Sequence, residues 1–248
     1  NWKMHLDRAD IAAFCASLRE GGGVDGVRLG VFPPFVYLAE VVEALKGTDV
    51  VVGAQTCRPE EKGAFTGEVA ARMVKDVGAT HVIVGHSERR HVFGETDTDV
   101  RERLDAALAL GLDVILCVGE TIEERRADRT EEVIGGQLRA GVAGLDGALV
   151  AERITVAYEP VWAIGTGEVA TPAQAQEAHA YLRGLAIELI GDDAAKRLVI
   201  QYGGSVKPDN ASELLSCPDV DGALVGGASL KCDSLIAIAR CGDQGGAS

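Results

Sequence analysis

The sequence predicts an α/β fold in which repeated strand–helix units build one barrel around a parallel sheet. Short apolar runs of strand length alternate with longer segments of helical period along the chain. Several of these runs carry Val or Ile at successive positions, as parallel strands covered by helices do. The alternation continues over 248 residues, a length that α/β barrels commonly reach as one domain. We therefore expect a single domain over residues 1–248, with a Gly-rich, flexible tail at 241–248.

The apolar runs are the predicted strands. In chain order they are Val27–Phe32, Val50–Ala54, His81–Val84, Val114–Val118, Ile154–Tyr158, Leu198–Gln201 and Gly222–Val225. A repeated order of strand, helix and strand is typical of a parallel sheet with helices packed on its outside. Regular repetition to this length favours a closed barrel over an open sheet.

The segments between these runs supply the predicted helices. The clearest are Ile11–Arg19, Val36–Leu45, Thr98–Leu110, Thr121–Ala140, Ala173–Ile190 and Asn210–Leu215. Ala173–Ile190 has the best-marked ends, because Thr171 and Pro172 form an N-terminal signal and Gly191 is a C-cap residue.

Charge and composition exclude several classes of function. The chain has 24 Lys and Arg against 38 Asp and Glu, a net charge of −14, which argues against a nucleic-acid or anionic-membrane partner. No apolar run approaches the roughly 20 residues of a membrane span, and the first residues do not resemble a signal peptide. The six cysteines show no CxxC motif, so we expect a reducing cytoplasm and no zinc.

Polar residues gather where the predicted strands end, which is where a barrel carries its chemistry. These residues are Gln55, His86, Glu88, Glu120, Glu159, Gly203–Ser205 and Gly226–Gly227. A lone Gly pair is weak evidence, because many turns need glycine. Two pairs after the last two strands are stronger evidence, because barrels bind phosphate there through backbone N–H groups.

Glu159 ends an apolar strand and is followed by a candidate lid. Taken alone, it could equally be a solvated carboxylate. Pro160, Val161 and Trp162 on one side and Gly165–Gly167 on the other give a stiff entry and a permissive exit to an apolar tip. A lid that lowers Trp162 and Ile164 over the carboxylate would remove water and make it a stronger base. That arrangement suits proton abstraction from carbon.

His86 follows the predicted strand His81–Val84 and lies at the start of a helix. A lone histidine is more often structural, but the positive end of a helix dipole disfavours imidazolium, and a neutral ring could donate a hydrogen bond and shuttle protons. Lys3 is a candidate cation at the barrel mouth, with a solvated lysine as the alternative. Arg89 and Arg90 are expected to be structural partners of acids such as Glu95.

Several segments in order along almost the whole chain resemble the triosephosphate isomerase family. They are residues 1–4 (NWKM), 63–68 (GAFTGE), 85–90 (GHSERR), 116–120 (LCVGE), 157–167 (AYEPVWAIGTG), 201–206 (QYGGSV) and 221–230 (DGALVGGASL). The resemblance implies a (β/α)8 TIM barrel that interconverts dihydroxyacetone phosphate and D-glyceraldehyde 3-phosphate through an enediolate, without a metal or organic cofactor. Lid closure would then also protect the enediolate phosphate from losing its phosphate in water.

The resemblance also implies a role for each site residue. Glu159 would be the base, and neutral His86 would polarise the carbonyl. Lys3 would counter the negative charge, with Asn1 beside it on the substrate and Glu88 orienting the polar network. The phosphate would be held by backbone N–H groups of Gly165, Ser205, Gly226 and Gly227.

The family forms homodimers, which predicts one here through the loop Thr56–Glu68, a connection longer than the usual 2–6 residues. His5 and Thr56 depart from the asparagines usual in the family, which puts interface chemistry in doubt more than catalysis. The family places one strand just before the Asn-Trp-Lys segment, so we expect apolar, β-branched residues ahead of Asn1 that complete the first strand.

Two other function classes remain open from the residues. A phosphate-binding aldolase would use Lys3 as a Schiff-base amine, which borohydride would trap with substrate. A barrel that only binds or scaffolds would have lost its base or lid, whereas Glu159, His86 and Lys3 are all present.

Overall fold

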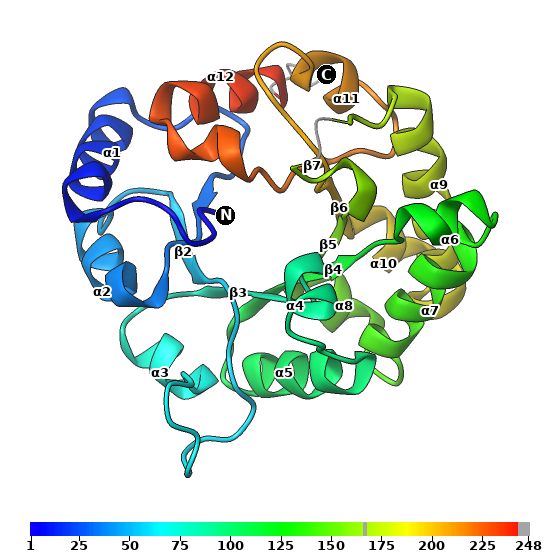
Figure 1. The fold of residues 1–248 in the computed structure, drawn as a ribbon, viewed down its shortest axis with the longest axis horizontal. Coiled ribbons are helices and arrows are strands. Elements are labelled where there is room, and N and C mark those ends of the chain that lie inside the picture. The colour runs from blue at the N-terminus through cyan, green and yellow to red at the C-terminus, as the bar shows by residue number, and fades with distance from the viewer. Residues whose placement is uncertain (166–167, 243–248) are drawn as a thin grey trace.

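The computed structural model describes residues 1–165 and 168–242, which form a curled parallel sheet with helices packed around it. Each strand pairs in parallel with the next one along the chain, and Figure 1 shows the strands inside a ring of helices. The strands are β1 Gly30–Val31, β2 Val51–Ala54, β3 His81–Val84, β4 Asp113–Val118, β5 Ile154–Tyr158, β6 Val199–Tyr202 and β7 Gly222–Ala223. The predicted α/β barrel is confirmed.

The first two residues of the sequence hydrogen-bond to both edges of the sheet. The main-chain nitrogen of Asn1 donates to the carbonyl of Val225 at 2.9 Å, and the N–H of Trp2 donates to the carbonyl of Phe32 at 3.1 Å. Phe32 follows β1 and Val225 lies just beyond β7. Asn1 and Trp2 therefore bridge the two edge strands at their carboxyl ends.

The two edge strands are shorter than predicted. β1 keeps Gly30 and Val31 of the expected Val27–Phe32, and β7 keeps Gly222 and Ala223 of the expected Gly222–Val225. Each edge strand has a continuous partner on one side only, β2 for β1 and β6 for β7. The residues beside them still bond to these partners, because the Leu29 carbonyl accepts the Val51 N–H at 2.9 Å and the Leu224 N–H donates to the Tyr202 carbonyl at 2.9 Å.

The helices outnumber those predicted. They are α1 Arg8–Gly21, α2 Phe35–Ala44, α3 Ala71–Asp76, α4 Ser87–His91, α5 Asp97–Ala109, α6 Ile122–Arg126, α7 Thr130–Val142, α8 Gly147–Arg153, α9 Pro172–Ile190, α10 Asp192–Arg197, α11 Ala211–Leu215 and α12 Cys232–Gly242, with 3-10 turns η1 Val161–Ala163 and η2 Gly227–Leu230. Short helices such as α3 and α10 escape prediction because one or two turns are too few to establish a period.

The single helix predicted over Thr121–Ala140 is wrong, since this segment contains two helices. Thr121 caps α6 through a capping box with Glu124. The chain then breaks at Asp128, whose φ of 53° is left-handed and incompatible with a continuous helix. α6 has a single apolar residue, Ile122, and no buried residue, so no apolar period marks it as a separate helix.

The core has two layers. Inside the barrel lies a cluster of Phe32, Ile83, Ile115, Cys117, Ala157 and Leu224. Gly53 makes room for it, because a Cβ at this position would come within 2.2 Å of the Phe32 ring. A second, larger apolar layer packs the outside of the sheet against the helices and includes Leu104, Ile134 and Leu182.

Cys241 and Gly242 end α12 and so do not belong to the expected flexible tail. Residues 243–248, and Thr166 and Gly167 of the expected lid, lie outside the described residues. All six cysteines carry free thiols. Within the described chain, no helix is long and apolar enough to cross a membrane.

Candidate active site

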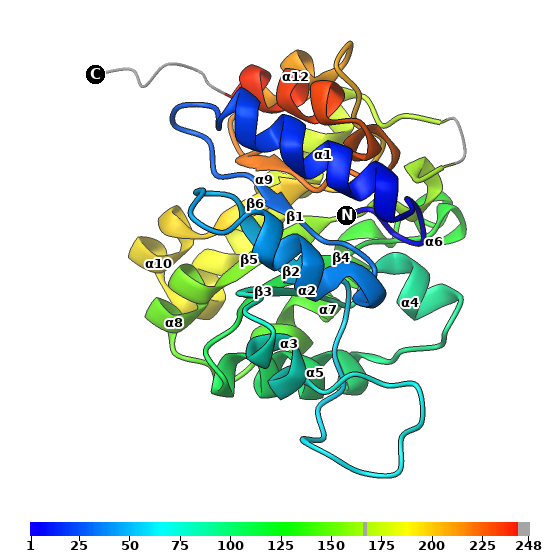
Figure 2. The ribbon, with the colours of Figure 1, turned by 90° about the vertical axis from the view of Figure 1, so that its left-hand side faces the viewer.

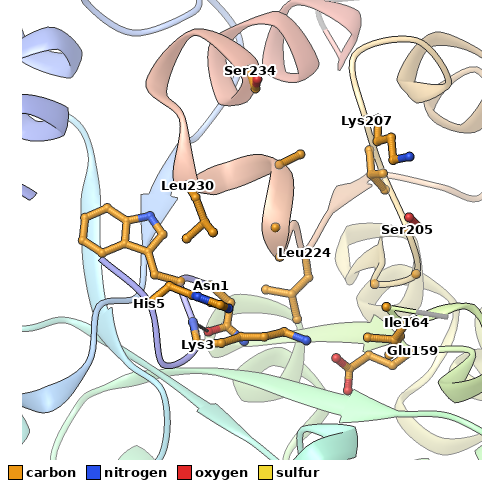
Figure 3. A pocket seen from close by; sticks show the side chains of 18 of the residues that line it. Asn1, Lys3, His5, Glu159, Ile164, Ser205, Lys207, Leu224, Leu230 and Ser234 are labelled. Atoms are coloured by element: carbon orange, nitrogen blue, oxygen red, sulfur yellow. Dashed lines mark hydrogen bonds between the residues drawn. The ribbon is translucent and has the colours of Figure 1, made fainter. Parts of the chain in front are cut away.

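A pocket of about 850 Å³ opens at the carboxyl ends of the strands. Figure 3 shows Asn1 and Lys3 on one side, with the lysine side chain extending toward Glu159. The predicted site residues that line the pocket are Asn1, Lys3, His86, Glu159, Gly165, Ser205, Gly226 and Gly227. Glu88 does not line it, but it contacts Lys3, which does. The structure thus brings the predicted set together from distant parts of the chain.

Glu159 follows β5 directly and its carboxylate is buried. One oxygen, Oε1, lies 3.0 Å from Nε2 of His86, and the other, Oε2, accepts the Ser87 N–H at 2.8 Å. Burial raises the pKa of Glu159, but the contacts with His86, Ser87 and Lys3 lower it by more, so the pKa lies below its ordinary value. The carboxylate is therefore held ionised, which a general base requires.

His86 is the N-cap residue of α4, as the helix start after β3 predicted. Its Nδ1 accepts the backbone N–H of Glu88 at 3.2 Å. A ring nitrogen that accepts a hydrogen bond carries no proton, so the ring is neutral with its hydrogen on Nε2. This Nε2–H donates to Oε1 of Glu159, and both side chains line the pocket.

Lys3 occupies a strained backbone conformation with φ of 51°, which costs a residue other than glycine of order 1–3 kcal/mol. Three contacts maintain it. The Lys3 N–H donates to Oδ1 of Asn1 at 2.9 Å, and Nε2 of Gln55 donates to the Lys3 carbonyl at 2.8 Å. Its Nζ lies 2.6 Å from Oε1 of Glu88. In this conformation Lys3 lines the pocket, and its ammonium group is paired with Glu88.

The two Gly turns follow β6 and β7, as expected. Gly203 needs to be glycine, because a Cβ there would lie 2.8 Å from Cγ of Glu159. The N–H groups of Gly226 and Gly227 have no hydrogen-bond partner among the described residues, which leaves them available to an anion. The Ser205 N–H differs from expectation, since it donates to the Ala163 carbonyl at 3.1 Å.

The candidate lid is anchored at its entry by a carboxylate whose role the sequence did not predict. Glu120 is fully buried, and its Oε1 accepts from Nε1 of Trp162 at 3.0 Å, from the Tyr158 hydroxyl at 3.1 Å and from Arg125 at 3.1 Å. Trp162 is thus held at Glu120 rather than over Glu159 as expected. Ile164 does line the pocket. The expected rise in the basicity of Glu159 is also absent in this arrangement.

Arg89 and Arg90, which follow His86, form ion pairs within the fold. Arg89 pairs with the buried Glu95, as predicted, and Arg103 also contacts that carboxylate at 3.3 Å. Arg90 donates to the Gly85 carbonyl at 2.8 Å and pairs with Asp97. Both predicted structural roles are confirmed.

The comparisons with known proteins agree with this geometry. A family described as Triosephosphate isomerase matches residues 1–242. Among curated proteins, the triosephosphate isomerase of Syntrophotalea carbinolica is 49% identical over 97% of this chain and 95% of its own length. That of Carboxydothermus hydrogenoformans is 50% identical over 97% and 96%, and that of Citrifermentans bemidjiense is 52% identical over 97% and 96%. A buried carboxylate beside a neutral histidine in a barrel mouth, together with these similarities, shows that the chain belongs to the triosephosphate isomerase family.

Proposed function

We propose that this protein is a triosephosphate isomerase that interconverts dihydroxyacetone phosphate and D-glyceraldehyde 3-phosphate by proton transfer through an enediolate. The observation that carries the proposal is the 3.0 Å contact between Nε2 of neutral His86 and Oε1 of Glu159 in a pocket that also holds Lys3. A carboxylate base paired with a neutral imidazole is the recognised pattern of this family.

Glu159 is the proposed base that removes the proton from one substrate carbon and returns it to the other. In the present arrangement both of its oxygens already have partners, Nε2 of His86 and the Ser87 N–H. Turning into the pocket would break the bond to Ser87 while the carboxylate stays buried. The carboxylate would then lose a contact that lowers its pKa and keep the burial that raises it, so its basicity would increase.

His86 is the proposed electrophile. Once Glu159 moves toward substrate, the Nε2–H of His86 would be free to donate to the substrate carbonyl oxygen and then to transfer protons between the two oxygens of the enediolate. The Nδ1 bond from Glu88 N–H holds the tautomer that this donation needs. The proton transfers use no metal ion or organic cofactor, because carboxylate and imidazole carry all of them.

Lys3 and the Gly turns are the proposed binding groups for the two anionic ends of the substrate. The Lys3 ammonium would offset negative charge on the enediolate and the phosphate, with Asn1 beside it and Glu88 positioning it. The phosphate would take backbone N–H bonds from Gly165, Ser205, Gly226 and Gly227. The Ser205 N–H would first have to leave the carbonyl of Ala163. Local dipoles and one lysine thus bind a dianion in an acidic protein.

The aldolase alternative is less compatible with the site. The Nζ of Lys3 lies 2.6 Å from a Glu88 carboxylate oxygen, and an ammonium group in such a pair lacks the lone pair that attacks a carbonyl. The expected result of borohydride treatment with substrate is no covalent adduct on Lys3. A substrate-dependent increase in mass on Lys3 would instead favour the Schiff-base reaction.

We extend the proposal to a homodimer formed through the loop Thr56–Glu68. Figure 2 shows this loop, in cyan, standing away from the barrel. Its shape is held internally, because the guanidinium of Arg58 lies 4.3 Å from the centre of the Phe65 ring. Met4 is 92% exposed beside the pocket, as expected of a residue that a partner subunit would cover.

We also propose that residues 1–248 form one domain and that the protein works in a reducing cytoplasm, to which its free thiols are suited. The test of the activity is a coupled assay. Purified protein is mixed with D-glyceraldehyde 3-phosphate and glycerol-3-phosphate dehydrogenase, which oxidises NADH as dihydroxyacetone phosphate forms. Protein-dependent NADH oxidation is expected, and a rate no higher than without the protein would refute the proposed activity.

A further inference from the structure

The fold buries one histidine that the proposed chemistry does not use. His179 lies on α9, in the second turn after its start, and its side chain is completely buried. Its ring meets Tyr158 edge-on at 5.8 Å between centroids and lies 6.3 Å from the ring of Tyr202. The tyrosine rings are themselves 6.4 Å apart, so the three form one cluster outside the sheet.

Hydrogen bonding determines the state of the His179 ring. Nδ1 lies 3.0 Å from the backbone carbonyl of Asp219, which can only accept, so Nδ1 carries the hydrogen. Nε2 is buried with no hydrogen-bond partner among the described residues. Burial lowers the pKa of His179 to about 4. The ring is therefore neutral and fixed at one end to the segment that leads into β7.

Both tyrosines end strands that carry parts of the site. Tyr158 directly precedes Glu159, and its carbonyl accepts the Gly203 N–H at 2.7 Å. Tyr202 directly precedes Gly203, and its side chain packs so closely against Gly204, two residues on, that a Cβ on Gly204 would lie 2.2 Å from the tyrosine hydroxyl oxygen. A displaced tyrosine ring would therefore displace either the base or the turn proposed to bind phosphate.

The hydroxyl group of Tyr158 extends the cluster to the beginning of the connection between β5 and α9. The hydroxyl of Tyr158 donates to Glu120, which also accepts from Trp162 at the beginning of that connection. The Tyr202 hydroxyl is buried with no hydrogen-bond partner among the described residues, and burial raises the pKa of Tyr202 to about 12. His179 touches the rings of both tyrosines.

We propose that His179 is a positioning residue that fixes Tyr158 and Tyr202 relative to each other, and so sets the distance between the base Glu159 and the phosphate turn at Gly203–Ser205. The inference rests on the proposed isomerase activity. It assigns to α9 a function beyond covering the sheet. Since a misplacement of about 1 Å can cost roughly 10²-fold in rate, loss of this support would affect both turnover and phosphate affinity.

Two substitutions separate the two contacts of His179. His179→Asn keeps an N–H near the position of Nδ1, and so keeps the bond to Asp219, but removes the ring from the tyrosines. His179→Phe keeps a ring against the tyrosines and loses the bond to Asp219. Leu185→Ala is the matched control, because Leu185 is a buried apolar residue on the same helix, nearly two turns farther on. Measured for each are the melting temperature, kcat, KM and the inhibition constant of inorganic phosphate.

The expected outcome is that His179→Asn lowers kcat/KM by at least about tenfold and weakens inhibition by inorganic phosphate. His179→Phe and Leu185→Ala should melt earlier while keeping kcat/KM within about threefold of the starting protein. If His179→Asn matches Leu185→Ala in kcat and phosphate inhibition, His179 is only a core residue and the proposal is wrong. An equal loss of kcat/KM in His179→Asn and His179→Phe would also overturn the proposal. If His179→Phe does not fold, the comparison of His179→Asn with Leu185→Ala decides. An inactive starting protein would instead refute the proposed function.

Discussion

The Nζ of Lys3 and the Oε1 of Glu88 lie 2.6 Å apart, although 85 residues separate them in sequence. Lys3 comes before the first helix, and Glu88 is in the first turn of α4. The same backbone segment of α4 holds the His86 tautomer through the Glu88 N–H. One short helix therefore positions both the cation and the electrophile of the proposed site.

Glu88→Gln should weaken catalysis through Lys3 without changing the fold. The amide cannot form the ion pair, so the strained Lys3 loses one of its anchors. Because Glu88 is 44% exposed, and ion pairs in contact with water contribute about 0–1 kcal/mol, kcat/KM should fall by up to about fivefold. Glu40→Gln, which removes the surface pair with Arg8, is the control and should be unaffected. Equal kcat/KM in the two variants would show that Glu88 does not position Lys3.

His86→Gln should lower kcat more than it raises KM. The side-chain amide can still donate a hydrogen bond but cannot shuttle a proton, and the neutral ring is proposed to act in the proton-transfer steps. Steady-state kinetics in both directions of the reaction will measure the effect. A variant with raised KM and unchanged kcat would mean that His86 only binds substrate.

Shortening the loop Thr56–Glu68 should give monomers with low activity. The loop tip carries Phe65 under the Arg58 guanidinium, and removing it removes the projecting surface of Figure 2. Sedimentation velocity at micromolar concentration should show the intact protein as a dimer and the shortened protein as a monomer. A monomeric intact protein would contradict the proposed assembly.

The lowered pKa of His179 predicts that the free energy of unfolding decreases as the pH falls through an identifiable range. Burial, only partly offset by the Asp219 carbonyl and the charge of Asp221 and reinforced by Arg183, lowers its pKa in the folded state from 6.5 to about 4. Between these values the unfolded chain binds the proton and the folded chain does not. Stability should therefore fall as pH drops from about 6.5 to about 4, by about 1.4 kcal/mol per pH unit at most.

Urea unfolding across that range will measure the slope. His179→Phe has no group that titrates at this position, so its stability should depend less on pH than that of the starting protein. If the free energy of unfolding changes with pH equally in the two proteins, His179 is protonated in the folded state or accessible to water.

Much of the fold and the site was predictable because each depends on local pattern. The strands are apolar runs, and Glu159, His86 and the Gly pairs follow them at the ends where a barrel carries its site. Glu120 could be placed at a strand end for the same reason. Its partners could not be predicted, because Tyr158 and Trp162 lie 38 and 42 residues away and meet it only once the barrel has closed.

Other features depend on contacts between residues far apart in the sequence, or on a backbone conformation that the apolar pattern does not reveal. Gln55 lies at a predicted strand end, but its two bonds, to the carbonyls of Lys3 and Phe32, follow from the tertiary fold. The turn at Asp128 divides a helical pattern through one left-handed residue. Trp162 was expected over Glu159, but its indole N–H donates to Glu120. The sequence alone does not show which of these two carboxylates the indole meets.

The most direct test of the proposed chemistry is to run the isomerisation in D2O and to measure deuterium in the product by mass spectrometry. Proton transfer through Glu159 and an enediolate predicts deuterium on the carbon that gains the proton, because the carboxylate exchanges its proton with solvent. Glu159→Gln, which keeps the shape and loses the base, should turn over about 10²–10⁴-fold more slowly. Product free of deuterium, or a Glu159→Gln variant within tenfold of the starting protein, would contradict the account.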